Sequence, residues 1–288
     1  MVLRRAIEAQ ARCVLGWLAE LDRSGWSASG ASPGGTVADL VAHLVAVQST
    51  IVSTLRAEPP GGSVVPMSVA DHLTSHRADH AADRAAGHTA GQEAEQERDL
   101  RTGTMSLWPA VAEIGTGDRA DDRSPNELLD RLRAGFAEVL AATDAALAAP
   151  IRVLAAPGGP LRTGDFLATR VLELVVHADD LGRSVPEVGS PELDPGALRI
   201  SVRLLADLFA SVVPGRSVEL RVPPHAAVQC VPGPRHTRGT PPNVVEVDPR
   251  TWLRLAAGRV GWAEAVAGGA VMASGDRSDL SAYLPVLA

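Results

Sequence analysis

Glu173 and His177 are the residues of this chain whose types and spacing most directly suggest chemistry. They are four positions apart, so on a helix they project from the same face about one turn apart. Phe166 and Leu181 continue the same stripe at helical spacing, which indicates that this face points inward. A buried carboxylate beside a buried imidazole is costly unless the pair is hydrogen-bonded or binds a metal.

A second histidine, His43, lies on a different predicted helix. It is three positions after Leu40 and four before Val47, so it also faces a core. His43, Glu173 and His177 could therefore bind one metal ion, and three N/O ligands with an open position are typical of catalytic zinc. The alternative is a hydrogen-bonded Glu–His pair with a separate, satisfied core histidine. Spacing alone leaves both interpretations open.

A rival metal-binding pattern is a ladder of three histidines, His72, His76 and His80. Side chains at steps of four on a helix can chelate a metal. However, the neighbouring side chains are charged and mark a polar face, namely Asp71, Arg77, Asp79, Asp83 and Arg84. We therefore favour a solvated helix face over a metal site.

A third cluster is Arg235, His236 and Arg238, in a short segment between two predicted strands. The planar fork of arginine suits carboxylates, so these three residues are candidate catalytic residues that recognise an anionic substrate. The alternative is a solvated loop that makes surface ion pairs.

The two cysteines lie far apart and form no CxxC motif, which fits a reducing compartment better than a disulfide scaffold. Cys13 lies beside Val14 and Trp17 on the first predicted helix, and Cys230 alternates inward in a predicted strand. We interpret both as core residues.

Composition excludes several kinds of function. All 27 basic residues are arginines, so no lysine is present to form a Schiff base. The net charge of -7 argues against a general nucleic-acid binder, because phosphate contacts need clustered positive charge. The sequence contains no GxSxG motif, Walker-type loop or Rossmann fingerprint.

Helical periodicity dominates the first two thirds of the chain. Capping boxes begin two of the predicted helices, at Thr36 with Asp39 and at Ser124 with Glu127. A polar, more exposed helix is expected near residues 68–100. The other expected helices run from Leu3 to Leu21, from about Thr163 to Gly182, and from Asp194 through Phe209. This part indicates a helical bundle.

The pattern changes after Pro214 and Gly215. Alternating apolar residues predict strands near residues 218–222, 226–230 and 244–247. Two short helices, a strand around Val271 and a terminal helix from Ser278 should follow. The chain is therefore expected to be an α+β protein with a helical domain at 1–190 and a small α+β domain at 191–288.

Two segments resemble one known family. Residues 36–44, TVADLVAHL, and 170–182, RVLELVVHADDLG, resemble the mycothiol-dependent maleylpyruvate isomerase family, and the similarity extends over essentially the whole chain. From Val218 through ASGDRSDL at 273–280 the chain resembles a sterol-carrier-like domain. The resemblance implies an N-terminal DinB-like antiparallel four-helix bundle, zinc and mycothiol as cofactors, and metal ligands at His43, Glu173 and His177.

The resemblance also implies a reaction. A metal-activated thiolate would attack an electrophilic carbon of a small, carboxylate-bearing substrate. An isomerase would add the thiol to a cis double bond, allow rotation and eliminate it, whereas an S-transferase would keep the adduct. One alternative is a non-catalytic protein that binds a lipid or small molecule in its sterol-carrier-like domain. Another is a resistance or detoxification protein that scavenges electrophiles.

The expected partners are a small-molecule substrate and a low-molecular-weight thiol, with neither nucleic acid nor membrane involved. The oligomeric state is left as monomer or dimer. The N-terminus lacks the long apolar stretch of a signal peptide, and no uninterrupted apolar run approaches the ~18 residues of a membrane span. We expect a cytoplasmic protein.

Overall fold

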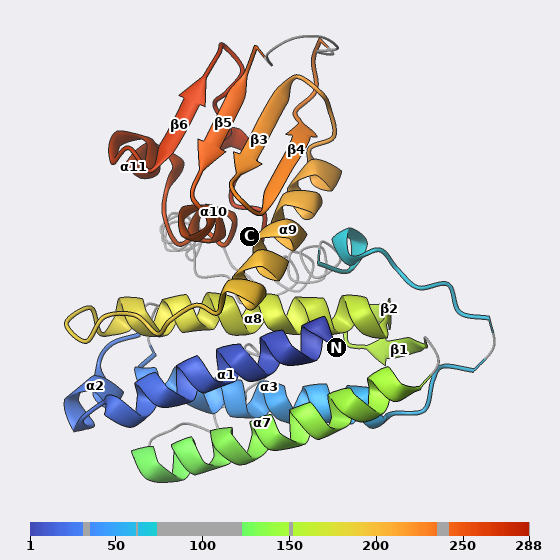
Figure 1. The fold of residues 1–288 in the computed structure, drawn as a ribbon, viewed down its shortest axis with the longest axis vertical. Helices are drawn as coiled ribbons and strands as arrows, with labels where there is room; N and C mark the ends of the chain where they lie inside the picture. Colours follow the sequence, from blue (N-terminus) through green and yellow to red (C-terminus); the bar gives the residue numbers. More distant parts are fainter. Residues whose placement is uncertain (31–34, 62, 74–122, 150–151, 235–241, 288) are drawn as a thin grey trace, which may run out of the picture. The chain divides into compact units, whose positions relative to one another are not determined.

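The computed structural model describes residues 1–30, 35–61, 63–73, 123–149, 152–234 and 242–287 (Figure 1). The described residues fall into two compact units. The first comprises the described residues of 1–72 and 123–198, and the second comprises Leu73 and those of 199–287. Helices fill the first unit, and a sheet with short helices forms the second. This architecture confirms the α+β class. The domain boundary expected after residue 190 stays a prediction.

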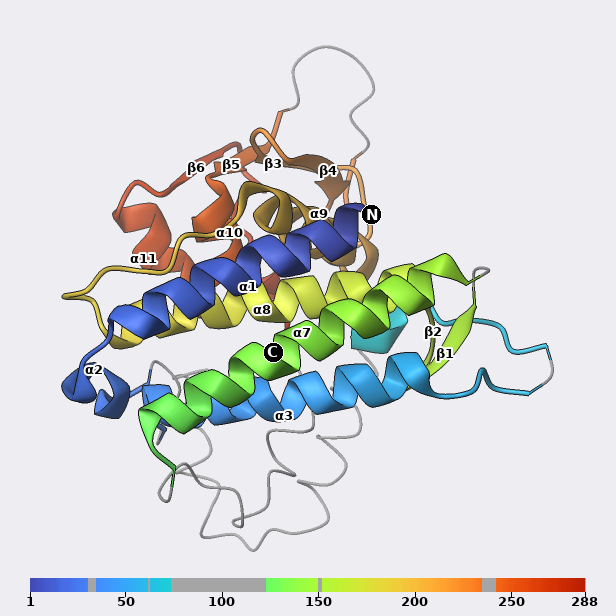
Figure 2. The same cartoon turned by 60° about the horizontal axis from the view of Figure 1, so that its bottom comes forward.

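Four long helices build the first unit: α1 (Val2–Glu20), α3 (Val37–Arg56), α7 (Pro125–Ala148) and α8 (Thr163–Ser184). Helices α1 and α3 each pack against both α7 and α8. Helices α1 and α8 run in one direction and α3 and α7 in the other (Figure 2). The short helix α2 (Arg23–Ser27), which the sequence did not predict, follows α1. The expected helical bundle is confirmed.

Both predicted capping boxes are present. The Thr36 hydroxyl accepts from the Asp39 backbone N–H, and the Asp39 carboxylate accepts from the Thr36 backbone N–H at 2.8 Å. Ser124 and Glu127 make the same reciprocal pair at the start of α7. These boxes satisfy backbone donors that a helix start leaves without partners, so they fix where α3 and α7 begin.

A small hairpin leads into α8 and was not predicted. Strands β1 (Val153–Ala156) and β2 (Gly159–Arg162) pair antiparallel, and Gly158 and Gly159 adopt positive φ in the turn between them. The hydroxyl and backbone N–H of Thr163 both donate to the Arg152 carbonyl at 3.1 Å. The Arg152 guanidinium donates to the Leu55 carbonyl at the end of α3. The hairpin therefore connects the C-terminus of α3 to the N-terminus of α8, the two helices that carry the candidate ligands.

The other end of α8 is connected to α1. After α8 the chain turns back, and the Trp17 indole donates to the Gly189 carbonyl at 2.9 Å. The Gln10 side chain donates to the Glu192 carbonyl and accepts from the Asp194 backbone N–H. Gln10 is fully buried, so both of its contacts are made away from water. Together with the hairpin, these contacts fix α8 at both ends.

The second unit has a four-stranded sheet in the order β4-β3-β5-β6. Its strands are β3 (Val218–Val222), β4 (Ala226–Cys230), β5 (Val244–Val247) and β6 (Val271–Ser274). Strands β3 and β5 are parallel, whereas β3–β4 and β5–β6 are antiparallel. Every second residue of β3 is buried, as the alternating pattern predicted.

Helix α9 (Pro195–Val212) continues from the first unit into the second, which also holds α10 (Pro249–Ala256) and α11 (Trp262–Ala267). In its core the rings of Phe209 and Trp252 meet edge to face, with centroids 5.6 Å apart. The terminal helix expected from Ser278 is wrong. Only a 3₁₀ turn forms there, at Ser281–Tyr283. Pro285 follows closely, and the residue before a proline avoids helical geometry; Leu284 is accordingly extended.

Within the described residues, helix α3 alone is long and apolar enough to cross a membrane by length and composition. Ten of its side chains are buried in the structure, among them Val41, Leu44 and Leu55. This helix is therefore a core element of the bundle. Of the polar helix expected near 68–100, residues 69–73 are helical and most of the remainder lies outside the described residues.

Candidate metal centre

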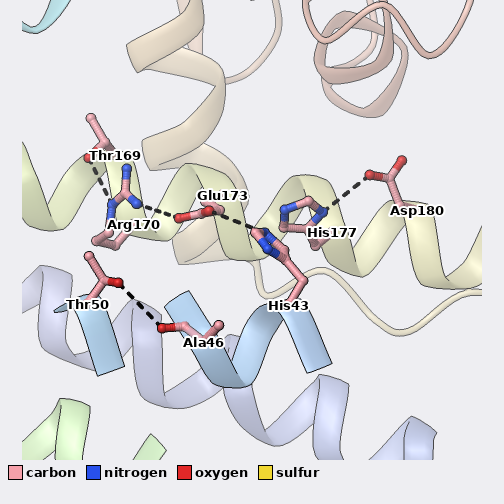
Figure 3. A network of polar contacts seen from close by, with 8 residues as sticks. All are labelled: His43, Ala46, Thr50, Thr169, Arg170, Glu173, His177 and Asp180. Carbon is pink, nitrogen blue, oxygen red and sulfur yellow. Dashed lines mark hydrogen bonds and ion pairs between the residues drawn. The ribbon is translucent and has the colours of Figure 1, made fainter. Parts of the chain in front are cut away.

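Helices α3 and α8 bring the three candidate ligands together (Figure 3). One ligand atom each from His43, Glu173 and His177 lies within 4.8 Å of the other two. His43 Nε2 is 3.8 Å from Glu173 Oε1. The two imidazole rings meet edge to face, with centroids 5.1 Å apart and an interplanar angle of 79°. Residues 130 positions apart in the sequence thus converge on one point.

These side chains are buried, and several of their polar atoms lack hydrogen bonds. His43, Glu173 and His177 are 5%, 2% and 5% exposed. Neither nitrogen of His43 nor Oε1 of Glu173 has a hydrogen-bond partner in the described part of the chain. The 3.8 Å separation of His43 and Glu173 is too long for a hydrogen bond. A buried polar atom left without a partner costs about 1–3 kcal/mol.

The donor set fits a divalent metal such as zinc. Two imidazoles and one carboxylate form a common catalytic zinc ligand set, and tetrahedral ligand atoms bonded at about 2.0–2.1 Å are about 3.4 Å apart. The 3.8 Å between His43 Nε2 and Glu173 Oε1 is close to that spacing, and the candidate ligand atoms of all three residues lie within 4.8 Å of one another. Two of the unpartnered atoms, His43 Nε2 and Glu173 Oε1, face each other across the 3.8 Å distance.

Arg170, one turn before Glu173 on α8, is part of the same network. Its Nη1 donates to Glu173 Oε2 at 2.6 Å, and both side chains are only 3% exposed. Its Nε donates to the Thr169 hydroxyl at 3.2 Å, and its guanidinium lies over the Phe166 ring. Burial lowers the pKa of Arg170, and Glu173 opposes that shift. The pair neutralises Glu173 on one oxygen and leaves the other for a ligand.

Asp180 lies one turn after His177 on α8, just as Arg170 lies one turn before Glu173. Its Oδ2 is 3.4 Å from His177 Nδ1, and its Oδ1 accepts from Arg183 at 3.4 Å. Asp180 is completely buried. Sequence reasoning overlooked both Arg170 and Asp180. Their spacing of three from a ligand on the same helix was the available signal.

The His43 imidazole is held in its neutral form. Burial, followed by the nearby His177 and Arg170, lowers the pKa of His43 from 6.5 to about 3. A neutral imidazole keeps a lone pair free, which is the form that binds metals. In the metal-free protein, His43 therefore offers a ligand atom without first losing a proton.

The pKa of His43 predicts how the metal-free protein responds to acid. Below pH 6.5 the unfolded chain protonates His43, whereas the folded protein resists protonation down to about pH 3. Stability should therefore fall as the pH is lowered through this window, with His43 contributing up to about 1.4 kcal/mol per pH unit. Urea unfolding between pH 7 and 5 measures this slope. His43→Gln should show a shallower slope, and equal slopes would contradict the assignment.

A small cavity of about 30 Å³ lies beside Glu173 in the bundle. Arg170, Glu173 and Gln48 supply its polar groups, and its other walls are apolar. Gln48 donates to the Leu132 carbonyl on α7 at 3.1 Å, in the space that the missing side chain of Gly135 leaves open. The cavity has room for about two water molecules. An organic substrate would not fit there.

The other predicted site residues have different outcomes. Arg235, His236 and Arg238 lie outside the described residues, as do His76 and His80. The anion receptor therefore stays a prediction. His72 is fully buried, so its placement on a solvated face was wrong; Asp71, one position earlier, is the exposed residue on this turn.

The two cysteines are confirmed as unpaired thiols. Cys230 is buried, and burial raises its pKa to about 11. Cys13 is only partly buried, so its interpretation as a core residue holds in part. Burial, followed by Glu192 and Asp194, also raises the pKa of Cys13. Neither thiol is activated as a nucleophile.

Comparisons with known proteins agree with this architecture. Residues 7–182 match the family model described as mycothiol maleylpyruvate isomerase N-terminal domain. Residues 194–286 match the model described as bacterial SCP ortholog. None of the curated proteins matches the chain.

Two solved structures are similar to the chain. A crystal structure of the mycothiol-dependent maleylpyruvate isomerase superposes with a TM-score of 0.55 and 13% identity, covering 96% of this chain and 92% of the other. A mutant of the mycothiol-dependent maleylpyruvate isomerase covers the same shares, with 15% identity and a TM-score of 0.49. At such identity the first likeness concerns the fold alone.

Proposed function

The chain belongs to the mycothiol maleylpyruvate isomerase N-terminal domain family, and we propose that it is a zinc- and mycothiol-dependent enzyme. Its reaction would be isomerisation or S-transfer on a small, electrophilic, carboxylate-bearing substrate. The observation that carries this proposal is the convergence of His43, Glu173 and His177 with unpartnered buried atoms. Arg170 pairs with only one oxygen of Glu173, so the other oxygen stays available to a metal ion.

The ligand types favour zinc over magnesium or calcium. Imidazole nitrogens suit zinc, whereas magnesium and calcium prefer oxygen ligands and more of them. When bound, zinc would supply a Lewis acid that keeps a coordinating thiol deprotonated at neutral pH. His43, Glu173 and His177 would hold it, and their burial would restrict access by water.

The thiol must come from outside the chain. Cys230 is buried and has a raised pKa, and the pKa of Cys13 is raised as well. Neither side chain supplies a thiolate at neutral pH. A low-molecular-weight thiol is therefore the reactant that this site lacks, and the family description names mycothiol.

The reaction itself follows from the chemistry of a thiolate and a conjugated double bond. Addition of sulfur to one alkene carbon leaves a single bond that can rotate. Elimination of the thiol then gives the isomer, whereas protonation of the adduct gives a stable thioether. We propose Arg235 and Arg238, with His236, as the groups that bind the substrate carboxylate and fix its orientation.

Metal removal tests the proposal directly. The purified protein should carry about one equivalent of zinc by elemental analysis. Dialysis against a chelator should abolish mycothiol-dependent conversion of maleylpyruvate, or of another electrophile such as a chlorinated aromatic, while circular dichroism stays unchanged. Addition of zinc should restore activity, and magnesium should not. Full activity in the chelated protein would contradict the proposal.

The alternative of a lipid carrier rests on the second unit, which matches the bacterial SCP model. Trp252, a large apolar side chain that could line a ligand site in this unit, is 1% exposed and packs on Phe209. This contact assigns Trp252 to the protein's own core. We therefore favour the enzyme, and we place it in the cytoplasm, where a free thiol cofactor stays reduced.

A further inference from the structure

We propose that Asp180 is a positioning residue of the metal centre, which holds Nδ1 of His177 so that Nε2 is presented to the ion. The inference rests on the proposed function. Asp180 is not one of the candidate ligands, and its effect on the tautomer of His177 and on zinc affinity can be measured without an activity assay.

The geometry places Asp180 on the outer side of His177. The carboxylate Oδ2 lies 3.4 Å from Nδ1, and Figure 3 shows the other ring nitrogen on the side of Glu173 and His43. The ring thus has a carboxylate on one nitrogen and the proposed ligand cluster on the other. His177 Nδ1 makes no hydrogen bond to the described residues, and at 3.4 Å a small rotation of the ring would let it donate to Oδ2.

A neutral imidazole carries one proton, and only the nitrogen without it can bind a metal. A carboxylate that faces Nδ1 stabilises the tautomer with the proton on Nδ1. Nε2 is then left with its lone pair, on the side of the other two ligands. Asp180 would therefore select the tautomer and the ring orientation that the site needs.

Arg183 is a second neighbour of the Asp180 carboxylate. A buried carboxylate is expensive, and its contact with Arg183 is also 3.4 Å long. Arg183 is about one-third exposed, which weakens that ion pair as a source of stability. Arg170 holds the outer oxygen of Glu173 from the preceding turn in a corresponding arrangement. Helix α8 thus supports each of its two ligands with a charged residue three positions away.

The first test uses the metal-free wild-type protein, so no variant needs to fold. Long-range ¹H–¹⁵N correlation spectra at pH 8 report which nitrogen of each histidine is protonated, and His177→Gln identifies the His177 signals. We expect the proton on Nδ1. A proton on Nε2 would overturn the inference.

The second test measures zinc affinity by competition with a chromophoric chelator. Asp180→Asn should weaken zinc binding about 10- to 100-fold, as loss of such outer partners commonly does. Cobalt substituted for zinc should show altered visible absorption bands, because these report ligand geometry. Asp179→Asn changes the adjacent, equally buried carboxylate and should bind zinc within about twofold of the wild type.

The outcomes separate the two proposals. Zinc affinity and cobalt bands in Asp180→Asn equal to those of the wild type would reject the role of Asp180 and leave the proposed function intact. A wild-type protein that binds no zinc at all would reject both.

Discussion

Replacement of His43 by alanine should leave a folded bundle that retains no zinc through gel filtration and has lost at least about 100-fold in thiol-dependent turnover. The loss follows because His43 is the only ligand that α3 contributes to the cluster of described residues. The two candidate ligands that remain, one turn apart on α8, would offer only two donor atoms, which should bind zinc too weakly to survive gel filtration. The fold should survive, because neither nitrogen of His43 makes a hydrogen bond within the described residues.

The matched control lies on the same helix. Thr50 is two turns further along α3, and its hydroxyl donates to the Ala46 carbonyl at 3.5 Å (Figure 3). Thr50→Ala should keep both zinc and activity. Elemental analysis and steady-state rates of the two variants, side by side, decide the matter. One equivalent of zinc in His43→Ala would show that the ligands are assigned wrongly.

Arg170→Leu is expected to have the largest effect on stability. It leaves the buried carboxylate of Glu173 without its counterion, and breaking a buried ion pair in this way costs about 3–5 kcal/mol. Urea unfolding of the metal-free protein measures this loss. Addition of zinc should stabilise Arg170→Leu more than the wild type, because the ion would then provide the missing positive charge.

Two comparisons make this experiment specific. The double variant Arg170→Leu with Glu173→Leu should recover most of the stability, since apolar residues often replace a buried pair without loss. Arg133→Leu removes a surface pair with Asp130 at the same helical spacing, and it should cost no more than about 1 kcal/mol. Similar losses for Arg170→Leu and Arg133→Leu would mean that the buried pair does not stabilise the site.

Much of the helical unit could be predicted from the sequence, because its signals are local. The capping boxes at Thr36 and Ser124 depend on residues three positions apart, and apolar residues at helical spacing predicted that Phe166 and Leu181 of α8 are buried. The hairpin β1–β2 was missed because four-residue strands show almost no periodicity. Their pairing depends on the turn at Gly158 and Gly159, whose positive φ the sequence does not display.

The inward placement of the three candidate ligands could be predicted from the sequence, whereas the residues around them could not. Spacing placed His43 and Glu173 on inward faces, but it could not distinguish a metal site from a hydrogen-bonded pair. The structure favours the first, because the atoms converge without bonding one another. Arg170 and Asp180 look like ordinary helix charges in the sequence. Only their burial in three dimensions shows that they are partners of the ligands.

The contiguous stretch of α8 from Thr169 to Arg183 has a consequence for how such a centre can change. It holds two of the candidate ligands and the charged residues beside them, Arg170 and Asp180, so these parts are inherited together. Among the described residues of the cluster, only His43 comes from another helix. If the proposed site binds a metal, a cysteine or an aspartate at position 43 would offer a different donor atom. A single substitution at position 43 could therefore change the metal preference of the proposed site.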